Sequence, residues 1–163
     1  MASTIKTFLE EINEVDYHLI AIHTTLEDYR LAYFINQQLP VNLKKCTKDL
    51  HVKVKQGETH FARFHYEDED NLIFWDLIEN KNVVESKKNE LVRDLFSNSK
   101  ASFSLATYLL PEYKKVNFFL KIESEKKALE ISEFVSKINT IDKIAMVYSV
   151  DKNDIKSKDN LIF

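Results

Sequence analysis

Histidine side chains are the residues of this sequence best suited to bind a metal ion. The five histidines are His18, His23, His51, His60 and His65. None lies in a His-Glu-x-x-His or a Cys-x-x-Cys frame, so the common zinc motifs are absent. His18 and His23 are five residues apart, as are His60 and His65, and side chains at that spacing point to opposite faces of a regular strand. We therefore interpret the histidines as structural or surface residues and predict no metal site.

Cys46 is the single cysteine and the best candidate nucleophile. It lies close to Lys45 and Lys48, and neighbouring lysines can lower the pKa of a thiol. A nucleophile also needs a base and an orienting group, and no pattern in the sequence supplies them. The single glycine excludes the Gly-rich loops that bind phosphates and dinucleotides, as well as a Gly-x-Ser-x-Gly elbow. We predict no enzyme activity and no cofactor.

The densest acidic run, Glu67–Asn71, contains the oxygen ligands that Ca²⁺ prefers. An EF-hand loop requires glycine at its sixth position and glutamate at its twelfth, and both are missing here. We interpret the run as a solvated hairpin tip, whose charges could also prevent edge pairing between molecules. Glu27 and Asp28 suit the start of a helix. The neighbouring Arg30 could pair with Glu27 or bind a partner.

The elements that would position these side chains alternate between strands and helices. The 163 residues predict one domain, spanning 1–163. Continuous apolar runs and alternation predict strands, capping residues at Thr24 and Ser124 predict the starts of two helices, and the first helix should stop before Pro40. The predicted strands are 17–23, one within 41–54, 60–67, 72–79, 102–110, 116–123 and 144–150. A helix within 1–14 and one near 89–96 are also predicted.

Helices near both ends, with a run of strands between them, predict an α+β two-layer sandwich. We expect a mostly antiparallel sheet with the helices packed on one face, and specifically a ferredoxin-like core with extra strands. The strand at 17–23 should be covered on both faces because its apolar run is continuous. Residues 1–14 form an N-terminal extension, 82–101 a variable insertion and 151–163 a C-terminal tail.

The formal net charge of −3 and the pI near 6.0 provide no basic footprint, so we predict no nucleic-acid partner. No apolar run is long enough to span a bilayer, which predicts no membrane partner. The N-terminal stretch lacks the apolar core of a signal peptide. Because a single cysteine cannot form an internal disulfide, the expected location is the reducing cytoplasm.

The stretch Leu110-Pro111-Glu112, followed by Val116-Asn117-Phe118, resembles the signature of the IPExxxVDY family of uncharacterised bacterial proteins. Three of the six signature positions are identical, namely Pro111, Glu112 and Val116. The segments 26–36, 65–81 and 156–163 are similar to the family as well. The resemblance implies no established activity, because the family has none.

The departures from this signature suggest a structural motif. Asn117 replaces an aspartate and has no ionisable group, and Phe118 lacks the hydroxyl of a tyrosine. We expect Val116 and Phe118 to point together into the core, with Asn117 hydrogen-bonded near the turn. Residues 109–117 should form a hairpin loop between two successive strands, with Glu112 in solvent at its tip.

The tail ends in three apolar residues, Leu161, Ile162 and Phe163. They could dock onto their own domain or onto a neighbouring molecule as an added strand or short peptide. The absent catalytic signatures and the abundant aromatic residues suggest a small protein-interaction or assembly module, with self-association as one form. The alternative is a domain that senses a small molecule bound at a dimer interface, which rests on fold analogy alone.

Overall fold

The computed structural model describes residues 16–54, 57–86, 103–125 and 128–163. The helices predicted within 1–14 and near 89–96 lie outside these residues. Of the predicted insertion 82–101, residues 82–86 belong to a strand, β7. The strand predicted at 144–150 has those bounds, and most of the other predicted strands are present with shifted ends.

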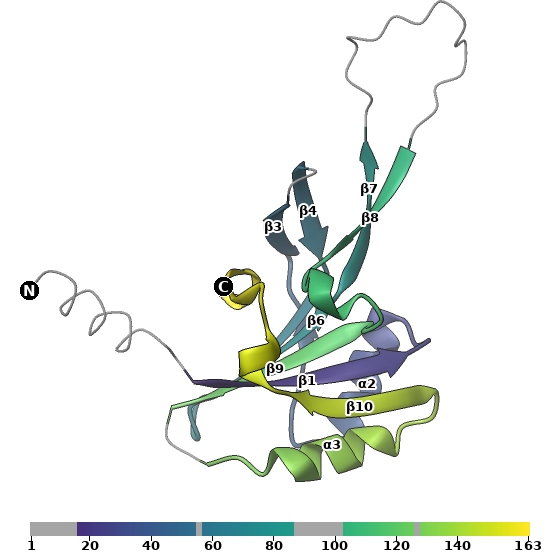
Figure 1. Ribbon diagram of the computed structural model, residues 1–163. Helices are drawn as coiled ribbons and strands as arrows, with labels where there is room; N and C mark the ends of the chain where they lie inside the picture. The colour runs from purple at the N-terminus through teal and green to yellow at the C-terminus, as the bar shows by residue number, and fades with distance from the viewer. Residues whose placement is uncertain (1–15, 55–56, 87–102, 126–127) are drawn as a thin grey trace, which may run out of the picture.

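One six-stranded sheet organises the described residues (Figure 1). Its order is β10-β1-β9-β6-β5-β2, and every neighbouring pair is antiparallel. The strands are β1 (Tyr17–Thr24), β2 (Lys44–Lys45), β5 (Arg63–Asp68), β6 (Ile73–Glu79), β9 (Phe118–Ser124) and β10 (Ile144–Val150). Two separate hairpins are formed by β3 (Leu50–Val54) with β4 (Gly57–Phe61), and by β7 (Lys81–Ser86) with β8 (Phe103–Tyr108).

The core of the sheet has the predicted ferredoxin-like arrangement. Helix α2 (Asp28–Gln38) follows β1, and helix α3 (Ile131–Asn139) connects β9 to β10. Without the inserted strands, the chain reads β1-α2-β6-β9-α3-β10, with β1 and β9 in the centre of the sheet. This is a βαββαβ order. Strands β5 and β2 extend the sheet beyond β6, so the fold is the predicted α+β sandwich with extra strands.

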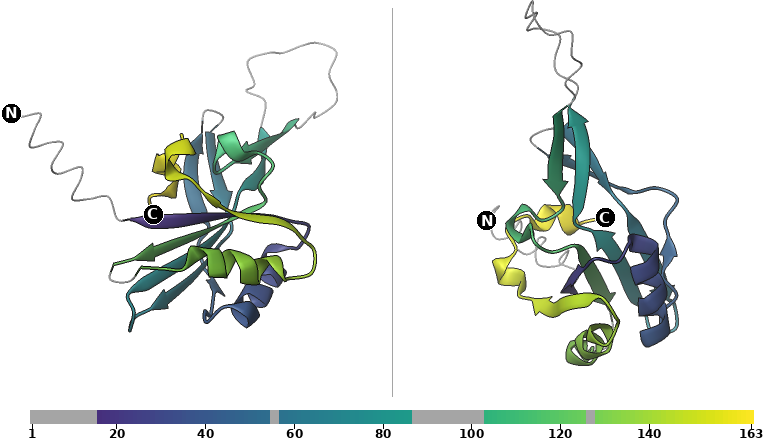
Figure 2. Two further views of the ribbon diagram at one scale, coloured as in Figure 1. Left: turned by 60° about the horizontal axis from the view of Figure 1, so that its bottom comes forward. Right: turned by 90° about the vertical axis from the view of Figure 1, so that its right-hand side faces the viewer.

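Both helices lie on one face of the sheet, as predicted, and enclose the larger core (Figures 1 and 2). Alternate side chains of the central strands point to this face because successive strand residues face opposite sides. Trp75 is buried on β6, and its ring meets Phe134 of α3 edge-on, with 5.0 Å between the ring centroids. The core includes Ile20, Ile22, Leu77, Leu120 and Ile122 from the sheet, Leu31 and Ile35 from α2, and Ile138 from α3.

The opposite face of the sheet carries a second core, covered by non-helical segments. Figure 2 shows the hairpins and the C-terminal tail on the side away from the helices. This core joins Leu19, Ala21, Ile78 and Phe119 of the sheet to Val52, Phe61, Leu109, Ile155 and Leu161. Strand β1 is therefore covered on both faces, which confirms the prediction from its continuous apolar run.

Both helices begin later than their capping residues predicted. Thr24 ends β1, and its hydroxyl donates a hydrogen bond to the carbonyl oxygen of Lys143 (2.9 Å). Helix α2 starts at Asp28 and ends before Pro40 as predicted. Ser124 likewise ends β9, and α3 starts only at Ile131. The predicted capping roles were wrong because both hydroxyl residues complete strands.

Two neighbouring tail residues allow a test of the second core. Leu161 is 1% exposed, whereas Ile162 is 78% exposed. We expect Leu161→Ala to lower the free energy of unfolding by about 2–4 kcal/mol, since it removes buried apolar surface and leaves a cavity. The matched change Ile162→Ala should cost less than about 0.5 kcal/mol. Urea unfolding measures both, and equal costs would contradict packing of the tail on its own domain.

Candidate functional site

Asn80, which follows β6, organises the loop that contains the family-like motif. Its side chain is fully buried, and its amide nitrogen donates to the carbonyl oxygens of Tyr113 and Val116, both at 2.9 Å. Its side-chain oxygen accepts the N–H of Leu110 (2.9 Å). Its backbone also pairs with Leu109 and Asn117. All the hydrogen-bonding groups of this buried residue are thereby used, and the course of the loop is determined by one side chain.

The motif loop is not the predicted hairpin loop. Strand β8 pairs with β7, whereas β9 pairs with β1 and β6, so the two strands flanking the loop do not pair with each other. Residues Pro111–Tyr113 form a short 3₁₀ helix with Pro111 in its first turn, where a missing N–H is tolerated. Leu110 is completely buried. The loop therefore lies against the second core.

Glu112 does not point into solvent as expected but holds the C-terminal tail. One of its carboxylate oxygens accepts the N–H groups of Lys156 (2.7 Å) and Ser157 (2.8 Å). The other accepts the hydroxyl of Ser157 (3.0 Å). Burial alone would raise the pKa of Glu112, but these hydrogen bonds outweigh it and lower the pKa below its usual value. The prediction of a solvent-exposed Glu112 was wrong because its hydrogen-bond partners lie more than forty residues away in sequence, where local patterns do not reveal them.

The second half of the motif is structural, as predicted, but Val116 and Phe118 do not point together into one core. Val116 belongs to the core under the tail and Phe118 to the core under the helices, so they do not face the same side. The reason is that β9 begins only at Phe118, which leaves Val116 in the loop. Asn117 forms the predicted hydrogen bonds. Its side-chain oxygen accepts the N–H of Thr24 (2.9 Å), and its own N–H donates to the carbonyl of Ile22 (3.1 Å).

The three apolar residues at the end of the tail have different environments. Leu161 is buried in the second core, and Ile162 is exposed. Phe163 is partly exposed at 37%, with Arg63 and Lys121 over its ring, each 4.5 Å from the centroid. The sequence left open whether the tail docks onto its own domain or onto a neighbouring molecule. In the structure, the tail docks onto its own domain.

Beneath the tail, a cluster of charged side chains lies on the sheet, and no pattern in the sequence indicates it. Asp76 of β6 is 4% exposed, and one of its oxygens bonds Arg63 Nε (2.7 Å) and His65 Nδ1 (2.8 Å) of β5. Lys121 of β9 is equally buried, donates to the carbonyl oxygen of Leu161 (2.8 Å) and pairs with Glu123. Each charged side chain of the cluster has a partner of opposite charge, and the tail covers the cluster. The cluster therefore joins the sheet to the tail.

The remaining chemical candidates have structural environments. His18 and His23 point to opposite faces of β1, as expected, whereas His51 and His60 are cross-strand neighbours with ring centroids 5.0 Å apart. Burial raises the pKa of the Cys46 thiol, which overturns the expectation that lysines would lower it. In the described part of the chain, no group of three or more His, Cys, Asp or Glu side chains could hold a metal ion.

The acidic run forms the turn between β5 and β6. Asp68 accepts the backbone N–H of Asn71 (3.2 Å) with one oxygen and the side-chain amide of Asn71 (2.7 Å) with the other. Leu72 completes the turn with φ of 53°, in the left-handed region. The acidic run therefore forms a hairpin turn that is stabilised by its own side chains, as the sequence predicted.

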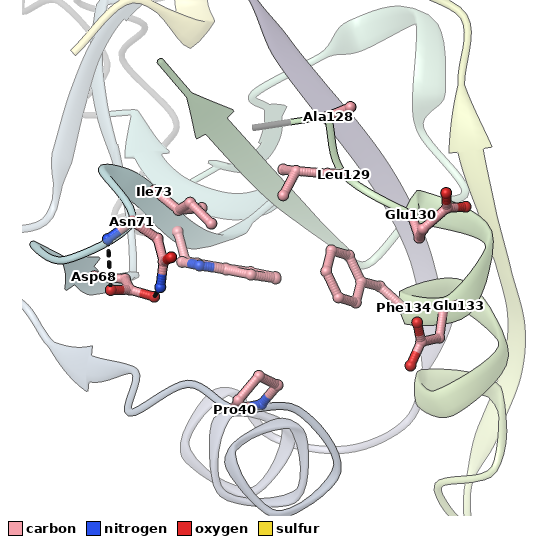
Figure 3. Close-up of a pocket in the computed structure, with 10 residues that line it drawn as sticks. Pro40, Asp68, Asn71, Ile73, Ala128, Leu129, Glu130, Glu133 and Phe134 are labelled. Atoms are coloured by element: carbon pink, nitrogen blue, oxygen red, sulfur yellow. Dashed lines mark hydrogen bonds between the residues drawn. The ribbon is translucent and has the colours of Figure 1, made fainter. Parts of the chain in front are cut away.

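A cavity of about 260 Å³ opens between the helices and the sheet (Figure 3). Its apolar lining comes from three elements, with Pro40 beyond α2, Ile73 and Trp75 on β6, and Leu129 and Phe134 at α3. Its acidic lining residues are Asp68, Glu130 and Glu133. Glu133 also pairs with Lys137 (2.6 Å), and the hydrogen bond from Lys137 lowers the pKa of Glu133. This mixture of apolar and acidic groups suits an apolar ligand that carries a positive charge.

The exposed side of α2 is a second feature of interest. Arg30 lies there beside Tyr29 and Tyr33, which are 59% and 57% exposed. Among the residues described, no ion pair joins Arg30 to Glu27, so of the two alternatives for Arg30 the structure does not show the pairing with Glu27. Tyrosine and arginine are common at protein interfaces, but nothing in the described chain indicates what would cover this surface.

The two edges of the sheet differ in a way that bears on interaction. At one edge, β2 is two residues long, and both are exposed lysines, which discourage pairing with another strand. At the other, β10 has seven residues, Ile144–Val150, without a charge or a proline. One side of β10 pairs with β1, and no described strand lies along the other. Met146 is 53% exposed on this strand.

Comparisons of the chain with known protein families, with curated proteins and with solved structures found no match. Among the described residues, no helix is long and apolar enough to cross a membrane. The geometry of the site itself is therefore the basis for assigning a function.

Glu112 provides a pH-dependent test of how the tail is held. The folded pKa is lowered, so the carboxylate stabilises the fold above the unfolded pKa near 4.5, and this stability is lost as the pH falls through the folded pKa. We expect Glu112→Gln to cost about 1–3 kcal/mol at pH 7, since charge-assisted hydrogen bonds are lost. The difference from the unmodified protein should narrow at pH 3.

Urea unfolding at both pH values measures this difference. Glu58→Gln is the matched control, because Glu58 is exposed on β4. If Glu112→Gln behaved like the control at pH 7, the carboxylate would not anchor the tail.

Proposed function

We propose that this protein is a small cytoplasmic interaction or assembly module that adds a strand of a partner to the β10 edge of its sheet. The observation that carries the proposal is the uncharged seven-residue edge strand, set against an opposite edge that ends in two lysines. Exposed backbone N–H and C=O groups on such a strand are a template for pairing. The cytoplasmic location is supported by the single cysteine, Cys46, which has no partner for an internal disulfide.

Membership of the IPExxxVDY family is part of this proposal. The contacts of the motif support a structural purpose, because Leu110 packs in the core, Glu112 anchors the tail and Asn117 closes the end of β1. None of these contacts requires the aspartate or the tyrosine of the signature. The motif would then preserve the shape that presents β10, rather than a reaction.

A second candidate function is small-molecule binding in the cavity between the helices and the sheet. Its apolar and acidic lining favours a cationic ligand with an apolar body, such as an aromatic amine. No residue of β10 lines this cavity. Small-molecule binding in this cavity would therefore not require a dimer interface at the β10 edge.

Replacing Met146 with lysine tests the edge proposal. A charge on an edge strand opposes pairing, so Met146→Lys should release partners that the unmodified protein captures from a cell extract, with a loss of about tenfold or more. Val83→Lys is the matched control, because Val83 is about as exposed but lies on β7, away from the six-stranded sheet's edge. Mass spectrometry of the captured proteins, including untagged copies of the chain itself, gives the readout. Equal capture by the two variants would contradict a role for β10.

The cavity can be tested by thermal unfolding against a panel of amines, amino acids, nucleotides and metal ions. A ligand at one hundred times its dissociation constant adds about 2.7 kcal/mol of stability, which raises the melting temperature measurably. We expect cationic apolar compounds to give the shift and Leu129→Trp to abolish it by filling the cavity. Saturable shifts with anionic compounds, or shifts that survive in Leu129→Trp, would remove the cavity from consideration.

A further inference from the structure

Charged residues of opposite sign flank the β10 edge. Asp142 and Lys143 precede the strand, and Asp151 and Lys152 follow it. When an antiparallel strand pairs with an identical copy of itself, the residues before one strand come to lie near those after the other. Lys143 would then lie beside Asp151 of the second copy at both ends of the pair, and Asp142 beside Lys152.

We propose that the strand added to β10 is β10 of a second copy, paired antiparallel about Val147. This inference rests on the proposed function and names its partner. The register places Met146 opposite Tyr148. Ala145 is the extra residue of a β-bulge in the pairing with β1, and Lys143 lies in the turn before the strand with a φ of 67°, so the long side chain of Lys143 has to reach Asp151 from outside the regular strand. A two-fold axis passes through the contact, so both copies use the same surface, which is the usual geometry of homodimers.

The side chains that would face each other are compatible in this register. Met146 and Tyr148 pair with His23 and Ala21 of β1, so both lie on the face of the sheet away from the helices. Directly opposed side chains of an antiparallel pair lie about 4.5–5.5 Å apart at Cβ. The exposed Met146 of each copy would be covered by Tyr148 of the other, and a thioether beside an aromatic ring is a favourable contact.

Other registers lose this charge complementarity. A shift that centres the pair on Met146 places Lys143 opposite Ser149, and one centred on Tyr148 places it opposite Asn153. Parallel pairing in register would place each lysine beside the same lysine of the second molecule, where the like charges repel. Asp151 is already held in place, because Oδ1 accepts the N–H of Asn153 (2.9 Å). Lys152 is engaged by Asp16 within its own chain, so Lys143 and Asp151 are the decisive pair.

A charge-swap experiment on the full chain tests both the partner and the register. Sedimentation equilibrium of the unmodified protein should give a concentration-dependent dimer. Lys143→Glu and Asp151→Lys should each weaken the dimer by about tenfold or more, because like charges then meet at both ends. An equimolar mixture of these two variants should form a heterodimer, and the double variant Lys143→Glu/Asp151→Lys should recover the affinity.

Lys48→Glu provides the matched control, since Lys48 is exposed outside β10 and its change in charge is identical to that of Lys143→Glu. Thermal unfolding of each variant checks that it is folded. Asp151→Lys could be unstable because it loses the contact to Asn153. In that case, hydrogen exchange of the β10 amides is compared between the unmodified protein and Lys143→Glu to test whether β10 pairs with a second copy. Protection that rises with concentration in the former and not in the latter supports the pairing.

A monomeric unmodified protein, or single variants that dimerise as well as Lys48→Glu, would overturn self-pairing. Neither result would remove the edge as an interaction site. If Met146→Lys still released a different captured protein, the proposed function would stand with another partner. If Met146→Lys released nothing, both proposals would fall.

Discussion

The arrangement of this fold away from its helices depends on the hydrogen bonds of one buried amide, that of Asn80. An unsatisfied amide in this position would cost about 1–3 kcal/mol, so its donors and acceptor require the loop 109–117 to follow one course. That course brings Glu112 to the tail, and the tail then closes the second core with Leu161. A single side chain thus connects β6, the motif loop and the end of the chain.

Much of the sheet could be predicted from the sequence, because strands covered on both faces have continuous apolar runs. The run at 17–23 contained this signal, and the order of strands and helices indicated the ferredoxin-like core. Local capping rules placed both helix starts too early, since Thr24 and Ser124 serve strands instead. Local chemistry cannot decide between those roles when a long-range partner such as Lys143 competes for the hydroxyl.

The candidate site was less predictable than the fold. Residues of the motif were recognised, but the partners of Glu112 and the role of Asn80 depend on segments that meet only after folding. The same holds for Asp76, whose cluster forms across neighbouring strands in one register. The uncharged edge, in contrast, was visible as a run of seven residues. Its importance depended on knowing that the strand closes one end of the sheet.

The unequal edges of the sheet also limit how far an assembly could grow. A strand that joined β10 would use the longer outer strand of the six-stranded sheet, and the outer strand at the opposite edge of that sheet consists of two lysines. Like charges on that edge disfavour pairing with another sheet, so β10 is the outer strand of the described six-stranded sheet that is better suited to association. A two-fold contact through β10 would use the same surface of both copies, so this contact by itself would end in a finite, symmetric particle.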